Sequence, residues 1–141
     1  MNIDKPEGYQ GYWPQCSFFG IYDGYKGYKC ADFLKDNLHL FVIQDSNFPE
    51  NPETALKNGF LMAEKRYMTI GVDELGNIID RSGACAIVAL FVDDMCYIAN
   101  CGDCRGLLSQ NQGKQDTVLS KDHTPMNEKE RITKEGGRVY Q

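Results

Sequence analysis

The residues best placed for chemistry follow an apolar run in the first quarter of the 141-residue chain. Phe18 to Tyr22 are mostly apolar, and Asp23 and Gly24 come directly after them. A carboxylate at the end of a buried strand is a frequent component of metal and phosphate sites. The same pair also suits a plain turn after a strand. Residues 25–27, with the sequence YKG, then lead into a segment with helical spacing.

A cysteine pair, Cys101 and Cys104, has the spacing of half a zinc site or of a redox pair. A zinc site needs about four ligands, but the sequence has no second pair of this spacing, and its histidines are His39 and His123. A redox pair would begin a helix, whereas these surroundings predict strand, turn and strand. We therefore interpret the pair as part of a turn.

The bulk properties predict one globular domain. The 16.0 kDa chain is 42% hydrophobic and 25% charged, and its net charge of -5 argues against a nucleic-acid binder. We find no apolar run long enough to span a membrane and no signal-peptide pattern. The expectation is therefore a cytoplasmic protein with six reduced cysteines and no membrane or nucleic-acid partner.

Apolar periodicity indicates an α+β order of elements. The chain predicts a strand, two helices, three or four antiparallel strands and a final helix, with Asn51 and Pro52 marking the start of the second helix. The predicted strands cover residues 17–22, 84–92, 95–99, 105–109 and 117–119, and the predicted helices cover about 28–42, 53–70 and 125–135. Residues 1–16 are expected to form an irregular arm and residues 17–141 a partial domain.

Four stretches, taken together and in order, resemble the metal-dependent protein phosphatase family, type 2C. They are FFGIYDGYKGYKCADFL, SGACAIVAL, IANCGDCRG and LSKDHTPMNEKERITKEGGRV. The resemblance covers about residues 17–140 and implies the first half of an α-β-β-α sandwich, in which two antiparallel sheets pack face to face. It also implies hydrolysis of phosphoserine and phosphothreonine by a water that bridges Mg²⁺ or Mn²⁺ ions.

The resemblance carries few site residues over to this chain. Asp23 matches the aspartate that bridges both metals, and Gly24 matches the glycine whose carbonyl binds one of them. Asp103 matches an aspartate linked to a third metal, although a turn aspartate explains Asp103 equally well. The family's histidine and the glycine after it are replaced by Tyr25 and Lys26. A tyrosine pKa near 10 suits proton donation at neutral pH less well than a histidine pKa near 6.5.

Other parts of the family's site are missing from the expected places. Residues 1–17 contain no arginine and no Glu-Asp pair, and the later Asp-Gly and Asp-Asn motifs would lie beyond Gln141. Acids elsewhere, such as Asp73, Asp80 and Asp93, are expected to be solvated in loops. His123 is expected to make a structural hydrogen bond, and Arg105 to pair with an acid or a carbonyl. No catalytic residue is assigned.

These observations favour a protein phosphatase 2C-like pseudophosphatase that binds no metal and serves as a binding or structural subunit. A protein partner or larger complex would complete its open sheet edges. Two alternatives stay open. One is an active Mg²⁺- or Mn²⁺-dependent phosphatase, acting on phosphoproteins, whose remaining motifs lie on another segment or chain. The other is a cysteine-based zinc or redox module.

Overall fold

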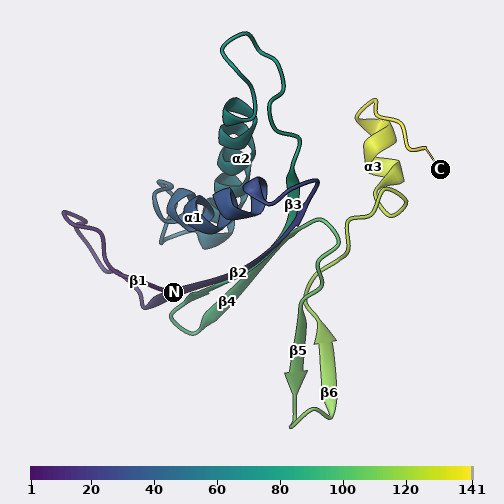
Figure 1. Ribbon diagram of the computed structural model, residues 1–141. Helices are drawn as coiled ribbons and strands as arrows, with labels where there is room; N and C mark the ends of the chain where they lie inside the picture. The colour runs from purple at the N-terminus through teal and green to yellow at the C-terminus, as the bar shows by residue number, and fades with distance from the viewer. Residues whose placement is uncertain (141) are drawn as a thin grey trace.

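The computed structural model describes residues 1–140. Within these residues the chain forms a four-stranded sheet, a two-stranded sheet and three helices (Figure 1). In chain order the elements are β1 (Asn2–Ile3), β2 (Cys16–Tyr25), α1 (Lys29–Ile43), α2 (Pro52–Ile70), β3 (Gly83–Val92), β4 (Met95–Cys101), β5 (Leu107–Gln110), β6 (Gln115–Val118) and α3 (Lys129–Lys134).

The main sheet is antiparallel throughout, in the order β1-β2-β3-β4. The register pairs Ile21 of β2 with Ile87 of β3, and Ala89 of β3 with Ile98 of β4. Since side chains alternate along a strand, this register assigns every second residue of neighbouring strands to the same face. The sheet therefore has two distinct faces.

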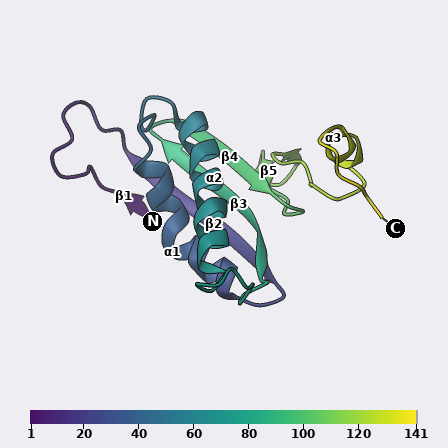
Figure 2. The same cartoon turned by 90° about the horizontal axis from the view of Figure 1, so that it is seen from above.

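Helices α1 and α2 cover one of these faces (Figure 2). Asn51 caps α2, where its side-chain oxygen accepts a hydrogen bond of 3.1 Å from the backbone N–H of Thr54, and Pro52 fills the first helical position. The core lies between the helices and this face of the sheet, and its members are Ile3, Cys16, Phe18, Cys30, Leu34, Leu38, Val42, Phe48, Ala55, Leu56, Ala63, Ala86, Val88 and Leu90.

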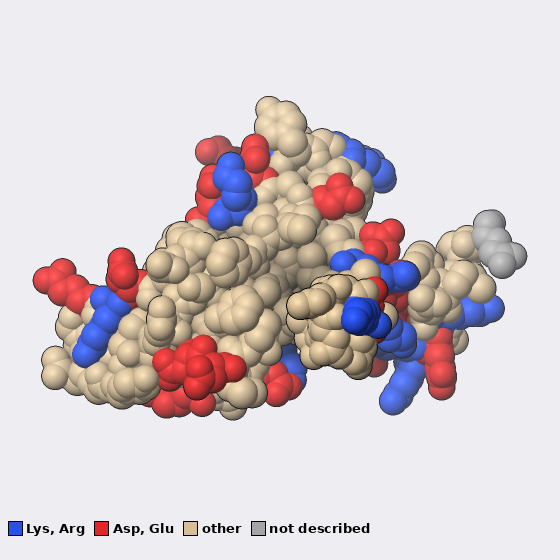
Figure 3. Space-filling model, turned by 90° about the horizontal axis from the view of Figure 1, so that it is seen from below, with Lys and Arg blue, Asp and Glu red and all other residues tan. Residues whose placement is uncertain are grey.

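The opposite face of the sheet carries apolar side chains without a cover among residues 1–140. Phe19, Ile21 and Phe91 are 55%, 68% and 42% exposed. Seen from this side, the middle of the molecule is nearly free of charged side chains, which gather around its margin (Figure 3). We call this surface the open face and define it by Phe19, Ile21, Ile87, Ala89, Phe91 and Ile98.

The β5–β6 hairpin leaves the sheet on the side opposite the helices (Figure 1). Its strands pair with each other, and all their residues are exposed. The short helix α3 follows near the carboxyl end of the chain. The hairpin thus stands beside the open face and leaves it uncovered.

The mixed α+β architecture with two antiparallel sheets is confirmed. The face-to-face arrangement implied for a whole domain is not completed within the described residues, because the second sheet projects from the first. Several bounds differ from prediction: β2 continues to Tyr25 and β4 to Cys101, whereas β5 begins at Leu107, β6 at Gln115 and α3 only at Lys129. In the N-terminal arm, Asn2 and Ile3 pair with Ser17 and Cys16 and add a short strand.

None of the helices in residues 1–140 combines the length and the apolar character needed to cross a bilayer.

Candidate functional site

Asp23 lies near the carboxyl end of β2, directly opposite Cys85 of β3. Alternation along β2 puts its side chain on the same face as Ile21, at one end of the open face. The residue is exposed. The strand was predicted to end at residue 22, but β2 continues to Tyr25, so Asp23 lies within the strand near its end.

The turn between β2 and α1 depends on close backbone contacts. A Cβ atom at Gly24 would lie 2.9 Å from the carbonyl oxygen of Gly27 and 3.3 Å from the Cβ of Ala31. Lys26 and Gly27 have positive φ angles of 55° and 137°. Glycine adopts such angles freely, whereas a lysine does so at a cost. The turn brings the start of α1 against the end of β2 and fixes the backbone next to Asp23.

Asp103 reaches the same region from the other end of the chain. It follows Gly102, whose φ is 101° and whose added Cβ would lie 2.4 Å from the sulfur of Cys85. This close approach lets the Cys85 thiol donate a hydrogen bond of 3.3 Å to the Asp103 carboxylate. Cys85 thus contacts Asp103 and pairs in register with Asp23, so the fold gathers three residues that are far apart in sequence.

The carboxylates of this cluster affect the pKa values of the nearby Cys85 and Cys104 thiols. A backbone hydrogen bond from Asp103 lowers the pKa of Cys85, but burial, the Asp103 side chain and the Asp23 charge outweigh it, and the net pKa is raised. Burial, followed by the charges of Cys85, Asp23 and Asp103, also raises the pKa of Cys104. The raised pKa values keep both thiols protonated at neutral pH, and a protonated thiol is a poor nucleophile.

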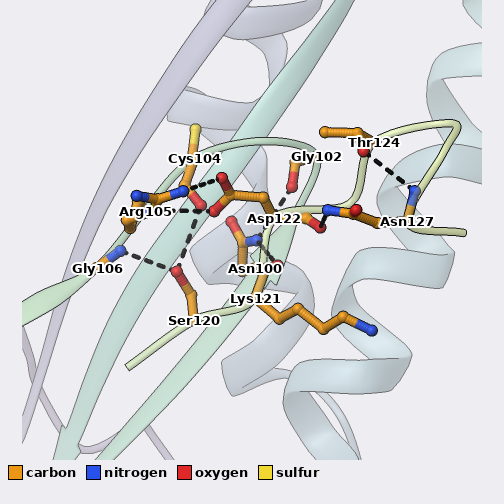
Figure 4. A network of polar contacts seen from close by, with 10 residues as sticks. All are labelled: Asn100, Gly102, Cys104, Arg105, Gly106, Ser120, Lys121, Asp122, Thr124 and Asn127. Atoms are coloured by element: carbon orange, nitrogen blue, oxygen red, sulfur yellow. Dashed lines mark hydrogen bonds and ion pairs between the residues drawn. The ribbon is translucent and has the colours of Figure 1, made fainter. Parts of the chain in front are cut away.

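The turn that carries Asp103 is braced by the segment after β6 (Figure 4). The Arg105 guanidinium forms a two-pronged ion pair with Asp122, which raises the pKa of Arg105 and lowers that of Asp122. The Ser120 hydroxyl accepts from the N–H of Gly106 at 2.8 Å and donates to the carbonyl of Cys104 at 3.3 Å. The predicted pairing of Arg105 with an acid is confirmed.

His123 and Asn100 complete this bracing. The N–H of Gly102 donates to the His123 Nδ1 atom at 3.4 Å, and the His123 N–H donates to the Gly102 carbonyl at 2.9 Å. The Asn100 side chain donates to the carbonyls of Gly102 and Lys121, whereas its own buried oxygen has no partner among the described residues. The structural role predicted for His123 is confirmed.

Comparison with known proteins agrees with this geometry. The family model described as Protein phosphatase 2C matches residues 7–141, nearly the whole chain. The chain belongs to the protein phosphatase 2C family. It is 37% identical to Probable protein phosphatase 2C 27 and 36% identical to Probable protein phosphatase 2C 14, both of Arabidopsis thaliana, over 98% and 87% of its length. It is also 32% identical to human Protein phosphatase 1A over 97% of its length.

The chain spans only part of these relatives. Its matches cover 36% of Probable protein phosphatase 2C 27, 26% of Probable protein phosphatase 2C 14 and 36% of Protein phosphatase 1A. The activity, substrates and partners of a whole protein phosphatase 2C are therefore not carried over to this chain as findings.

The metals on which the protein phosphatase 2C family generally depends provide a test of the site. Mg²⁺ and Mn²⁺ prefer oxygen ligands. Asp23 and Asp103 both lie next to Cys85: Asp23 is its register partner on β2, and Asp103 accepts a hydrogen bond from its thiol. Residues 1–140 contain no cluster of three or more His, Cys, Asp or Glu side chains arranged to hold a metal. The described residues do not fit a pair of dications.

Tyr25, which stands where the family motif has histidine, packs against the neighbouring strand. A Cβ atom added to Gly83, its register partner on β3, would lie 2.3 Å from the Tyr25 ring. The ring therefore lies across Gly83. This packing fills the space that the glycine leaves at the end of the sheet.

The sequence reasoning missed the part that Cys85 and Asn100 play. Cys85 lies in an apolar run and was expected only as a strand residue, although Gly102 and Asp103 could have suggested a close neighbour. For Asn100, the Asn-x-Gly-Asp turn motif is the one sequence pattern that points to its hydrogen bonds with the neighbouring loop. Their contacts join segments about 18 to 21 residues apart in sequence, so periodicity could not reveal them.

One prediction about the loop acids was wrong. Asp80 is not solvated: its side chain is only 16% exposed and forms an ion pair of 3.1 Å with Lys29. It also accepts hydrogen bonds from the N–H and hydroxyl of Ser82 and from the Tyr67 hydroxyl. The reason is the path of the loop, which returns along the end of α2 and the start of α1 before it enters β3. Asp80 is a structural clamp and lies outside the Asp23 cluster.

Proposed function

We propose that this chain is a catalytically silent member of the protein phosphatase 2C family that acts as a binding or structural subunit. The observation that supports this most directly is the Asp23–Cys85–Asp103 cluster. Two carboxylates beside a thiol offer too few oxygen ligands to anchor two dications. Without anchored metals, no residue of the cluster can activate the attacking water at neutral pH.

The surface of the chain supports the binding role. A folded monomer of 16.0 kDa exposes about 7,400 Å², whereas this chain exposes 10183 Å². In addition, β4 is an edge strand whose outer side has no strand partner among residues 1–140. An open edge beside an apolar face favours addition of another polypeptide.

The alternative function is that of an active phosphatase acting on phosphoserine or phosphothreonine. The specific observation in its favour is that Asp23 and Asp103 are brought to one place, as metal ligands would be. In that case a further segment or chain would supply the remaining carboxylates, and Mg²⁺ or Mn²⁺ would bind between the two parts.

An activity assay separates the two functions. The purified chain would be incubated with Mn²⁺ and either p-nitrophenyl phosphate or a phosphothreonine peptide, alongside Asp23→Ala and the matched variant Asp94→Ala, which removes an exposed turn carboxylate. We expect turnover equal to that of buffer with Mn²⁺ for all three proteins. Turnover that is lost in Asp23→Ala and kept in Asp94→Ala would establish the active alternative.

A Mn²⁺ binding measurement tests the same proposal without any substrate. Calorimetric titration with Mn²⁺ should show no saturable binding that depends on Asp23. Two-site binding abolished by Asp23→Ala would contradict the proposal even if the substrates tested were unsuitable.

The cytoplasmic location expected from the sequence belongs to this proposal. Its support is that all six cysteines are free thiols in the structure, which suits a reducing compartment.

A further inference from the structure

A cavity of about 650 Å³ lies where the N-terminal arm packs against the loop between α1 and α2. All of its lining residues fall between residues 6 and 51. The arm enters β2 at Cys16, which is the end of the strand opposite to Asp23. The cavity is therefore separate from the Asp23 cluster, and its size lies within the range of about 300–1,000 Å³ that is usual for ligand pockets.

One wall of the cavity is aromatic. The rings of Tyr9 and Trp13 meet edge to face with their centroids 5.2 Å apart, and Trp13 packs in the same way on the buried Phe48, at 5.4 Å. Tyr9 and Trp13 are only half-buried and both line the cavity. Aromatic rings attract a cation within about 6 Å of the ring centroid. The arm already contains one such contact, because the Lys5 Nζ atom lies 5.6 Å from the Tyr9 centroid.

Two carboxylates, Glu50 and Asp45, line the same cavity. The Oε1 atom of Glu50 accepts a hydrogen bond of 2.8 Å from the Tyr9 hydroxyl, which leaves its second oxygen without a partner among residues 1–140. Asp45 accepts from amide groups of Asn47 and Asn58, and these hydrogen bonds, with those of Asn47 first, lower its pKa. Neither acid forms an ion pair within the part of the chain that the structure describes. Both charges are therefore held in place without being neutralised.

The end of α1 adds to this negative potential. Ile43 and Gln44, the last residue of α1 and its C-cap, line the cavity, and the last turn of α1 carries no basic residue. The carbonyl groups at a helix C-terminus favour a nearby cation. The positive end of α2 begins on the same side, but the Asn51 cap and Glu53 of the first turn already compensate it. Since none of the lining residues between 6 and 51 is a lysine or an arginine, the cavity lacks a cation of its own.

We propose that this cavity binds an arginine side chain of a partner protein. A guanidinium group is planar, stacks on aromatic rings and forms two parallel hydrogen bonds with a carboxylate. The cavity offers Tyr9 and Trp13 for stacking and the Glu50 carboxylate as acceptor. A lysine ammonium group is more strongly hydrated and lacks the planar fork, so it fits less well. The inference goes beyond the proposed function, because the cavity does not involve the Asp23 cluster or depend on whether that cluster is silent.

Trp13 supplies the readout for a test, because it is the one tryptophan of the chain. The 141-residue chain would be titrated with N-acetyl-arginine methylamide, a model for an arginine residue, at constant ionic strength while tryptophan fluorescence is recorded. We expect a saturable change with a Kd of about 1 mM. N-acetyl-lysine methylamide should bind about tenfold more weakly, and the uncharged isostere N-acetyl-citrulline methylamide should not saturate. An equal response to the citrulline compound, or no saturable response to the arginine compound, overturns the inference.

Substitutions assign the binding to the cavity. Glu50→Gln removes the charge but keeps an oxygen that can accept from Tyr9, so the variant should fold like the parent and bind the arginine compound about tenfold more weakly. The matched control is Glu74→Gln, which neutralises an exposed acid in the loop between α2 and β3 and should bind like the parent. Tyr9→Leu should also weaken binding, whereas Tyr9→Phe keeps the ring and should retain most of it. A parent-like Kd in Glu50→Gln, or an equal loss in Glu74→Gln, contradicts the proposed site.

The salt dependence of binding gives a second readout. The Kd for the arginine compound should rise with added NaCl, because salt screens the attraction between the guanidinium and the two acids. A Kd that stays constant or falls would indicate an apolar contact and refute the inference. The result is independent of hydrolysis: an inactive chain that does not bind the arginine compound refutes this inference alone, and an active chain that binds it refutes the silent function alone.

Discussion

The Asp23 region shows how single residues determine the backbone and the surroundings of one carboxylate. Gly24 and Gly27 keep the conformations that the turn requires, while Lys26 adopts a φ of 55° that favours glycine. At the same scale, the Cys85 thiol donates a hydrogen bond to Asp103 and stands opposite Asp23 in the strand register. The fold thus brings two carboxylates and a thiol to one end of the open face.

Lys26→Gly is predicted to stabilise the protein by about 1 kcal/mol, because the left-handed conformation strains any residue with a Cβ atom. Chemical denaturation of the variant and the parent measures the difference. Lys26→Ala serves as control, since it removes the charge but keeps the Cβ. A gain of equal size in Lys26→Ala would assign the effect to charge instead.

At the level of elements, the helical layer depends on one very close contact. Gly59 of α2 lies against Val42 of α1, where an added Cβ would be 2.5 Å from a Val42 methyl group and 3.3 Å from its Cα. Val42 is fully buried. The glycine therefore sets how closely the two helices approach and, through them, how α1 sits on the sheet beside the Asp23 turn.

Gly59→Ala should destabilise the protein by about 1–3 kcal/mol through overpacking, despite the better helix propensity of alanine. Thermal unfolding of the variant, compared with the exposed α2 substitution Arg66→Ala, measures this. If Gly59→Ala proved more stable than the parent, the helices could separate without loss and the contact would not be limiting.

The Asp80 clamp predicts a pH dependence of stability. Hydrogen bonds from the Ser82 side chain and backbone, followed by the Lys29 ammonium and Tyr67, hold the Asp80 pKa well below its ordinary value. Because the folded-state pKa is depressed, the contribution is complete above the ordinary value near 4 and is lost as pH falls below it. Urea denaturation between pH 2 and 7 should therefore show the stability of the parent and of Asp80→Asn converging in acid.

Two related variants check the cause of that convergence. Ser82→Ala removes one donor and should weaken the pH dependence without abolishing it. Tyr67→Phe removes a hydroxyl bonded to Asp80 and Ser82 and should cost about 1 kcal/mol at pH 7. A constant difference between the parent and Asp80→Asn across the pH range would show that the clamp does not titrate as described.

At the scale of the whole molecule, the dominant feature is the imbalance between its two sheet faces. Two helices and fourteen buried residues lie on one side, whereas the other carries Phe19, Ile21 and Phe91 in contact with solvent. A sheet with one uncovered apolar face loses much of the burial that normally stabilises a domain of this size.

Several parts of the molecule could be predicted from residue patterns because they are local. Helical periodicity and the Asn51–Pro52 cap predicted α2 close to its observed bounds, and the apolar runs around Asp93 and Asp94 predicted the β3–β4 hairpin. The strand that leads to Asp23 followed from the same logic, although β2 continues to Tyr25. These features depend on residues that are close together in the sequence, so one sequence is enough to predict them.

Other parts were decided only by tertiary packing. The contact of Cys85 with Asp103, the enclosure of Asp80 and the direction of the β5–β6 hairpin all depend on segments that are distant in sequence. Sequence alone determined the family, the order of elements and the strand-end position of Asp23. Only the folded chain decided what stands beside that carboxylate and which face of the sheet stays open, because both depend on strand register and on the path of the chain between strands.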